Sequence, residues 1–312
     1  MGGRQAYLFP GQGSQFVGMG HDLYKMYPEA QAIFTEADDV LDFALSRLCF
    51  EGPEEVLTDT INTQPAILTV SIANLRVLEV RGAKLPAFVA GHSLGEYSAL
   101  VAAGALTFAD AVRLTCERGR LMKEAGKQTA GGMIAVLNLN SDALEEVCQE
   151  ASRATGGIAQ VANYNSPEQT VISGDLLTLK KVVALAQKRG ALQAIPLAVS
   201  IAGHSPLMGA MTDEFRQQVV ATAFREPTVP IIANVTAEPL MSVGAIREEL
   251  VKQLTCPVRW AASVQYMIGQ GVTKFVEIGP KNVLTRLIRR IDRRMEAISV
   301  GTVESIQMYL ES

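Results

Sequence analysis

One pentapeptide, Gly91-His92-Ser93-Leu94-Gly95, constrains the fold more than any other feature of the sequence. The apolar segment 87–90 before it is strand-like, and residues 96–104 after it are helix-like. A serine between two glycines at a sharp strand-to-helix turn is typical of a nucleophile elbow, which exposes the hydroxyl at a helix N-terminus. The alternative is that Ser93 only caps the helix.

The rest of the chain alternates short apolar runs with helical stretches, which predicts an α/β fold. Further strands of the main part are expected in residues 6–15, where a strand runs into a Gly-rich loop, and in 230–235 and 274–280. The expected helices of the main part are 28–48, 53–59, 63–80, 107–125, 206–223, 243–254, 260–270 and 282–293.

Residues 129–198 follow a different order of elements. The patterns predict, in turn, strand 131–137, helix 141–152, strands 158–165 and 169–174, helix 176–190 and strand 191–198. This βαββαβ order is that of a ferredoxin-like unit. The sequence therefore predicts an α/β domain of residues 1–128 plus 199–312, interrupted by a small subdomain of residues 129–198.

Charge and cysteine usage exclude several classes of function. The chain has 28 Lys and Arg against 32 Asp and Glu, a balance that disfavours nucleic-acid binding. It has no apolar run long enough to span a membrane. None of the four cysteines forms a CxxC pair, so we expect no metal site and reduced thiols in a cytoplasmic protein.

A serine nucleophile needs a general base, and the chain has only three histidines, His21, His92 and His204. His92 adjoins Ser93 in the turn, where neighbouring side chains diverge, and His21 is expected to open a helix. Elimination favours His204, although a capping or buried structural histidine is the alternative. Its imidazole could be oriented by a distant aspartate or by a backbone carbonyl.

The loop Phe9–Gln15 follows the first strand and lacks the signatures of a P-loop or a dinucleotide fold. In an elbow site a second strand-end loop supplies an oxyanion donor, so we expect backbone N–H groups from Gln12 and Leu94. Arg118 lies on the second helix after the elbow, between Arg113 and Arg120. A solvated helix face is the simplest interpretation of such arginines, and we adopt it for Arg113 and Arg120.

Taken together, the motifs resemble those of the malonyl-CoA:acyl carrier protein transacylases, the acyltransferase family of fatty-acid and polyketide synthesis. The resemblance covers essentially the whole chain. It is carried by FPGQGSQ (9–15), NTQPAIL (62–68), AGHSLGEYSAL (90–100), RLTCERGRLM (113–122), NYNSPEQTVISG (163–174), HSPLM (204–208), QLTCPVRW (253–260) and EIGP (277–280).

The resemblance implies an α/β-hydrolase-like core with a ferredoxin-like subdomain. It implies that Ser93 is the nucleophile, that His204 is the base and that Arg118 holds the free carboxylate of malonate. The implied reaction moves a malonyl group from malonyl-CoA to the phosphopantetheine thiol of acyl carrier protein, through a malonyl-Ser93 intermediate. No tightly bound cofactor is implied; malonyl-CoA and CoA are substrate and product.

The resemblance also implies supporting roles. Gln12 and Leu94 would supply the oxyanion N–H groups, and the backbone carbonyl of Gln253 would orient the histidine. Gln64 would line the site, and Asn163 would contact pantetheine.

Two features leave alternatives open. Gly203 stands before His204, where malonyl-selective polyketide domains carry a bulky aromatic, so exclusion of methylmalonyl groups is an open question. Six basic and two acidic residues lie within 281–296, which fits either carrier docking or a solvated helix face. An acyl-thioester hydrolase, a trans-acting polyketide acyltransferase and a non-catalytic carrier-binding scaffold are the alternative functions.

Overall fold

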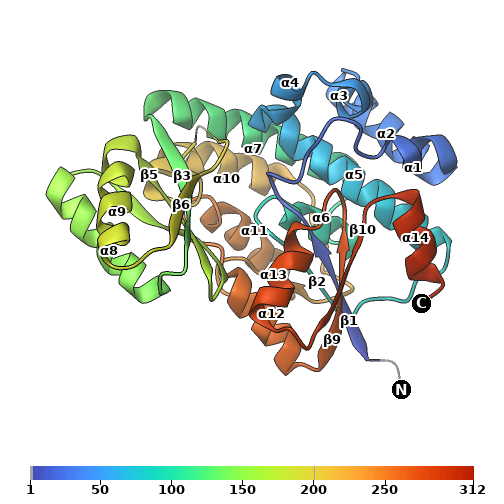
Figure 1. Ribbon diagram of the computed structural model, residues 1–312. Coiled ribbons are helices and arrows are strands. Elements are labelled where there is room, and N and C mark those ends of the chain that lie inside the picture. The colour runs from blue at the N-terminus through green and yellow to red at the C-terminus, as the bar shows by residue number, and fades with distance from the viewer. Residues whose placement is uncertain (1–2, 200) are drawn as a thin grey trace.

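Two β-sheets organise the chain in this computed structural model, which describes residues 3–199 and 201–312 (Figure 1). The strands of the larger sheet are β1 (Arg4–Phe9), β2 (Phe88–Gly91), β7 (Ile231–Ile232), β8 (Pro239–Leu240), β9 (Val272–Ile278) and β10 (Glu296–Val300). The helices around it are α1 (His21–Met26), α2 (Pro28–Leu41), α3 (Leu45–Glu51), α4 (Glu54–Thr58), α5 (Thr60–Val80), α6 (Gly95–Ala102), α7 (Phe108–Gln128), the 3₁₀ helix η1 (Pro206–Met211), α10 (Thr212–Ala221), α11 (Val243–Lys252), α12 (Trp260–Gly269), α13 (Val283–Ile291) and α14 (Val303–Leu310).

The larger sheet is parallel except for its short edge strand and has the order β10-β9-β1-β2-β7-β8. Alternate residues of β1 enter different cores: Tyr7 and Phe9 pack with α2, α5 and α7, whereas Ala6 and Leu8 pack with α12 and α13. Apolar side chains therefore cover both faces, which explains the continuous apolar run of this strand.

Adjacent strands bring two distant loops together. Because β1 and β2 are parallel neighbours, with Phe9 opposite Gly91, the loops that follow them emerge at the same sheet edge. These loops contain Gln12 and Ser93. A site at the carboxyl edge of a parallel sheet is the usual place for ligand binding in α/β proteins.

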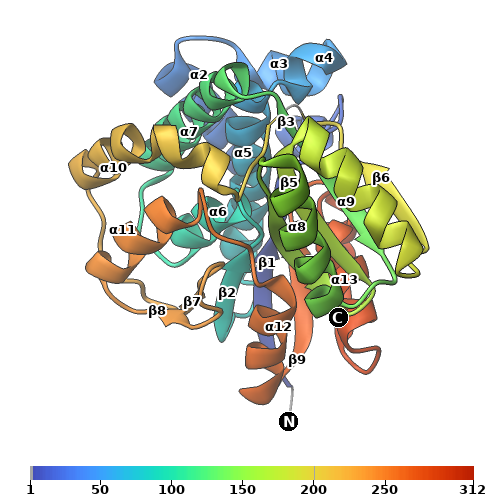
Figure 2. The same cartoon turned by 90° about the vertical axis from the view of Figure 1, so that its left-hand side faces the viewer.

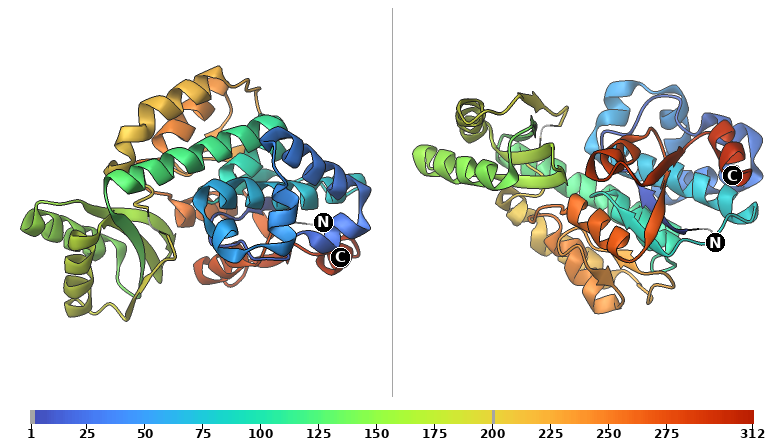
Figure 3. Two further views of the ribbon diagram at one scale, coloured as in Figure 1. Left: turned by 90° about the horizontal axis from the view of Figure 1, so that it is seen from above. Right: turned by 60° about the horizontal axis from the view of Figure 1, so that its bottom comes forward.

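The smaller sheet projects to one side of the core (Figure 3). It has the order β4-β5-β3-β6 with antiparallel pairs, and α8 and α9 pack side by side against one face (Figure 2). Its elements are β3 (Gly131–Leu137), α8 (Ser141–Thr155), β4 (Ala159–Ser166), β5 (Gln169–Asp175), α9 (Leu176–Lys188) and β6 (Gln193–Pro196).

The predicted α/β core with an inserted ferredoxin-like subdomain is confirmed by these two sheets. All four strands of the smaller sheet fall within residues 131–196. We therefore propose residues 1–128 plus 199–312 and residues 129–198 as the two parts. Within the described ranges, no helix has the length and apolarity needed to cross a membrane.

Several predicted elements were wrong. The helix expected over 28–48 is interrupted, because Asp42 adopts a left-handed backbone (φ 55°) between α2 and α3. The strand expected over 230–235 is reduced to the two residues of β7. Strands β8 and β10 and helix α14 were not predicted. Strand β10 has a mixed burial pattern at the sheet edge, so it lacks a clear apolar alternation.

Helices α5 and α7 approach closely at Gly119. A Cβ atom there would lie 2.6 Å from the backbone oxygen of Thr60 and 2.8 Å from the Cα of Ile61. Only glycine fits at this distance without moving a backbone. The contact places the preceding residue, Arg118, against the N-terminal half of α5, where it reaches Gln64.

Replacing Gly119 with alanine should therefore lower the free energy of unfolding by about 1–3 kcal/mol, despite the better helix propensity of alanine. Gly244 in α11 is a matched control, because a Cβ there meets nothing within 4 Å. Gly244→Ala should be neutral or stabilising by up to about 1 kcal/mol. Urea denaturation of both variants measures the difference, and equal effects would contradict the close approach.

Candidate active site

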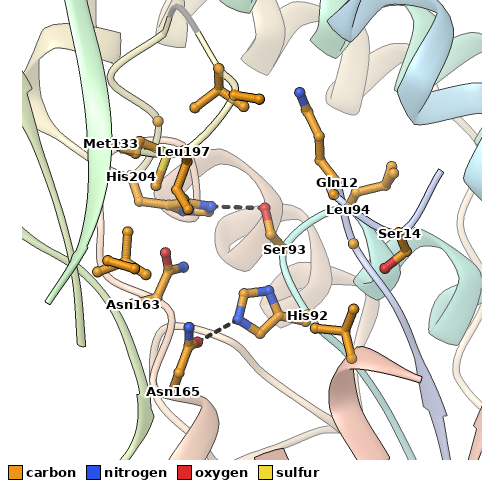
Figure 4. A pocket seen from close by; sticks show the side chains of 18 of the residues that line it. Gln12, Ser14, His92, Ser93, Leu94, Met133, Asn163, Asn165, Leu197 and His204 are labelled. Carbon is orange, nitrogen blue, oxygen red and sulfur yellow. Dashed lines mark hydrogen bonds between the residues drawn. The ribbon is translucent and has the colours of Figure 1, made fainter. Parts of the chain in front are cut away.

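A cleft of about 340 Å³ opens between the two sheets (Figure 4). One wall is formed by the loops after β1 and β2 and by α7, and the other by the face of the smaller sheet that α8 and α9 leave uncovered. Strand β4 joins the two walls, because Tyr164 N donates to Val258 O (2.9 Å) and Val258 N donates to Ala162 O (2.8 Å).

Ser93 occupies the tight turn that the sequence predicted. Its backbone is left-handed (φ 52°), a conformation that costs a non-glycine residue energy and is common at functional sites. Gly95 permits the turn, since a Cβ there would lie 2.0 Å from the backbone oxygen of Phe9. The serine thus lies two residues before the start of α6, with its side chain in the cleft (Figure 4).

His204 lies within reach of the serine. Its Nε2 is 2.8 Å from Ser93 Oγ, and its Nδ1 is 2.7 Å from the backbone oxygen of Gln253. A carbonyl oxygen can only accept, so Nδ1 carries the hydrogen and Nε2 is left to accept the serine proton. Of the two orienting groups that the sequence left open, the structure places a backbone carbonyl next to the imidazole.

The protonation state of His204 suits a base. Burial, followed by the positive charge of Arg118, lowers the pKa of His204 to about 3. Desolvation and a neighbouring cation both disfavour the imidazolium ion, so the ring is neutral at neutral pH. Gln160 adds a positioning contact, because its Nε2 donates to the backbone oxygen of His204 (2.7 Å).

Arg118 points into the site rather than into solvent and is only 2% exposed. Its Nη1 donates to Gln64 Oε1 (2.8 Å), and its Nη2 donates to Gln253 Oε1 (2.9 Å) and Ser93 Oγ (3.2 Å). Among the described residues, its Nε has no hydrogen-bond partner, and the acceptors of its two other nitrogens are all neutral side chains. A buried cation held only by neutral groups is costly, which makes this guanidinium a candidate site for an anionic group.

The other arginines of α7 behave as the sequence indicated. Arg113 pairs with Asp110 on the surface, and Arg120 bonds to three glutamates at the helix exterior. Lys281 donates to the backbone oxygen of Gly13 (3.0 Å), so the basic segment begins beside the loop that carries Gln12.

Gln12 and Leu94 lie beside Ser93 in the cleft, on the side away from His204 (Figure 4). Among the described residues, neither backbone N–H donates to a protein acceptor, so both are available to a negatively charged oxygen. Asn163 is buried and also lines the cleft. His92 bonds instead to Asn165 (2.8 Å), which keeps it occupied away from Ser93 Oγ.

Asn234 and Glu96 also contact the site and were not predicted from the sequence. Asn234 Oδ1 accepts from Ser93 N (2.7 Å), and no motif marked this residue, which follows a two-residue strand. Glu96 was detectable, because it is the only charged residue in the apolar helix α6. It is fully buried, and burial together with repulsion from Glu249 raises its pKa well above the usual range.

The lowered pKa of His204 predicts a wide pH range for acylation of Ser93. The active form is the neutral imidazole, so the rate should stay constant from about pH 7.5 down to about pH 5, and fall only as the pH approaches the pKa in the folded state. Stopped-flow acylation with an activated ester measures this profile.

Glu249 needs a control, because burial raises its pKa to about 7. The profile should therefore also be measured in Glu249→Gln. A loss of rate centred near the usual histidine value of about 6.5 that persists in this variant would contradict the assignment.

Comparisons with known proteins agree with this geometry. The family model described as acyl transferase domain matches residues 6–305. The chain is 45% identical to the malonyl CoA-acyl carrier protein transacylase of Bacillus subtilis (strain 168), over 98% of this chain and 96% of the relative. It is 42% identical to that of Escherichia coli (strain K12), over 98% of each chain.

Solved structures give the same result. The malonyl CoA-acyl carrier protein transacylase of Coxiella burnetii superposes with a TM-score of 0.96 at 40% identity, covering 99% of this chain and 97% of that one. A malonyl-transacylase in complex with its type II PKS acyl-carrier protein also superposes with a TM-score of 0.96, at 41% identity and with 99% of both chains covered. The chain belongs to the acyl transferase family.

Proposed function

We propose that this enzyme transfers the malonyl group of malonyl-CoA to the phosphopantetheine thiol of acyl carrier protein. The observation that carries the proposal is the buried, carboxylate-free guanidinium of Arg118 beside the Ser93–His204 pair. The names of the relatives support the donor and the acceptor, and the similar solved complex holds a carrier protein.

In the first half-reaction, Ser93 Oγ attacks the thioester carbonyl while His204 Nε2 takes its proton. Leu94 and Gln12 donate backbone N–H groups to the oxygen that becomes negative. The carbon–sulfur bond then breaks, and the CoA sulfur receives the proton from His204. The product is a malonyl ester on Ser93.

In the second half-reaction, the carrier thiol takes the place of CoA. His204 accepts the thiol proton as the sulfur attacks the malonyl ester, and it returns a proton to Ser93 Oγ when the ester bond breaks. Each half-reaction exchanges an ester with a thioester, so neither direction is strongly favoured. A neutral histidine at the start of each step suits this symmetric use.

Arg118 gives the proposed selectivity. In malonyl thioesters one methylene separates the free carboxylate from the reacting carbonyl, and Arg118 Nη2 already lies 3.2 Å from Ser93 Oγ. An acetyl group has no carboxylate and would leave the buried cation unpaired. Such a loss rejects an analogue far more strongly than a missing methyl group does.

The surroundings of the cleft bear on two finer points. A Cβ at Gly203 would lie 3.4 Å from Met122 Cε and 3.6 Å from Met133 Sδ, so flexible thioether side chains border the position before His204. We propose that the basic segment 281–294 docks the carrier protein, because this segment borders the cleft through Val283 and Leu284.

We also propose a cytoplasmic location, which the four free thiols support.

Incubation of the enzyme with malonyl-CoA should add one malonyl group to Ser93, seen by intact-protein and peptide mass spectrometry. Addition of holo acyl carrier protein should remove the adduct and yield malonyl-carrier. Ser93→Ala is the control and should form no adduct. Absence of an adduct on the wild type would favour a scaffold, and rapid release of free malonate without carrier would favour a hydrolase.

Arg118→Ala should reduce kcat/KM for malonyl loading by about two orders of magnitude or more, with a smaller effect on acetyl loading. Arg113→Ala is the matched control on the same helix, because its side chain is 61% exposed. A competition assay with mixed acyl-CoAs measures the ratio. Unchanged acyl preference in Arg118→Ala would contradict the role given to the guanidinium.

A further inference from the structure

Glu96 is a buried carboxyl group that the reaction itself does not use. It lies three residues after Ser93, in the first turn of α6, and is fully buried. Its Oε1 accepts from the backbone N and the Nδ2 of Asn234, both at 3.0 Å. Its Oε2 accepts from Gln253 Nε2 at 2.5 Å.

The other ends of these two amides hold the reactive groups. Gln253 Oε1 accepts from Arg118 Nη2 (2.9 Å), and Asn234 Oδ1 accepts from the backbone N–H of Ser93 (2.7 Å). Both amide nitrogens also donate to backbone oxygens of the elbow: Gln253 Nε2 to Ser93 O (3.1 Å) and Asn234 Nδ2 to Gly91 O (2.8 Å). Glu96 is therefore joined to Arg118 and to Ser93 through one amide each.

The donors at one end of each amide require one particular direction of that amide. A guanidinium and a backbone N–H can only donate, so each amide must turn its oxygen towards them. The nitrogen then faces Glu96, whose two oxygens accept three N–H bonds and donate none; these bonds favour the ionised carboxylate and oppose the rise in its pKa that burial causes. A flipped Gln253 would oppose its own N–H groups to those of Arg118, which leaves buried donors unpaired.

We propose that Glu96 is a positioning residue that sets the direction of the Gln253 and Asn234 amides, and thereby holds Arg118 and the Ser93 backbone ready for malonyl transfer. This inference rests on the proposed function. His204 is held separately, through the backbone carbonyl of Gln253, and does not depend on the side-chain amide.

A glutamine at position 96 keeps the size of the side chain but turns one acceptor into a donor. The oxygen of this glutamine accepts from the backbone N–H and the Nδ2 of Asn234, as Glu96 Oε1 does in the wild type. Its nitrogen therefore faces Gln253. Gln253 must then present its oxygen to residue 96 and its nitrogen to Arg118. The guanidinium loses its acceptor and Ser93 O loses the bond from Gln253 Nε2, while His204 keeps its contact with the backbone carbonyl of Gln253.

The test compares loading of Ser93 by malonyl-CoA and by acetyl-CoA in the wild type and in Glu96→Gln. The KM for malonyl-CoA should rise, and the malonyl-to-acetyl ratio of kcat/KM should fall about tenfold or more, since the anchor for the carboxylate is disturbed. A purely structural role would slow both donors equally. A ratio that is unchanged or raised would overturn the proposal.

Glu249→Gln is the matched control. Glu249 is also buried, but its carboxylate accepts from Val235 N (2.8 Å) and bonds to neither amide side chain. The same carboxyl-to-amide change there should leave the ratio as in the wild type. An equal fall in both variants would overturn the proposal. Failure of the wild type to accept malonyl-CoA would refute the proposed function instead.

A double-mutant cycle tests the route through Gln253. Gln253→Leu removes the amide but keeps the backbone carbonyl, so it should lower the same ratio. In the double variant with Glu96→Gln, the malonyl-to-acetyl ratio of kcat/KM should be no lower than in the more affected single variant, because both changes act on one chain of contacts. Additive losses would overturn the proposal.

If Glu96→Gln does not fold, Glu96→Asp replaces it in the loading assay. Its side chain is one methylene too short to reach both amides, so we expect the same fall in the malonyl-to-acetyl ratio.

Discussion

The buried guanidinium of Arg118 is the constraint on which the rest of the site depends. It is buried beside the cleft without a carboxylate partner among the described residues, so the surrounding amides of Gln64 and Gln253 have to hold it. The same charge contributes to the lowered pKa of His204, which keeps the base neutral. In the proposed reaction, one cation thus prepares a place for an anionic acyl group and favours the neutral imidazole that the attack requires.

Parallel β-structure explains how such distant residues meet. Neighbouring strands β1 and β2 end at one edge, which brings the Gln12 loop and the Ser93 elbow together. Helix α7 reaches the same edge because Gly119 lets it approach α5. Gln253, at the C-terminus of α11, uses its backbone for His204 and its side chain for Arg118. The site therefore depends on close backbone packing as much as on the reactive groups themselves.

Local sequence patterns were sufficient where the function depends on local geometry. The elbow around Ser93 and the βαββαβ order of residues 129–198 are visible in short windows of sequence. The positions of His204, Arg118 and Gln253 required the family resemblance or elimination, because contacts over such sequence separations leave no periodic signal. Asn234 was missed for this reason, and β10 was missed because an edge strand with mixed burial lacks the alternation of a covered one.

A crystal structure of the enzyme with a malonyl group on Ser93 tests the account most directly. We predict that the malonyl carboxylate lies within hydrogen-bonding distance of the Arg118 guanidinium and replaces the contact between Arg118 Nη2 and Ser93 Oγ. The carbonyl oxygen of the ester should face the backbone N–H groups of Gln12 and Leu94. A malonyl carboxylate directed out of the cleft into solvent, with Arg118 still bound only to amides, would contradict it.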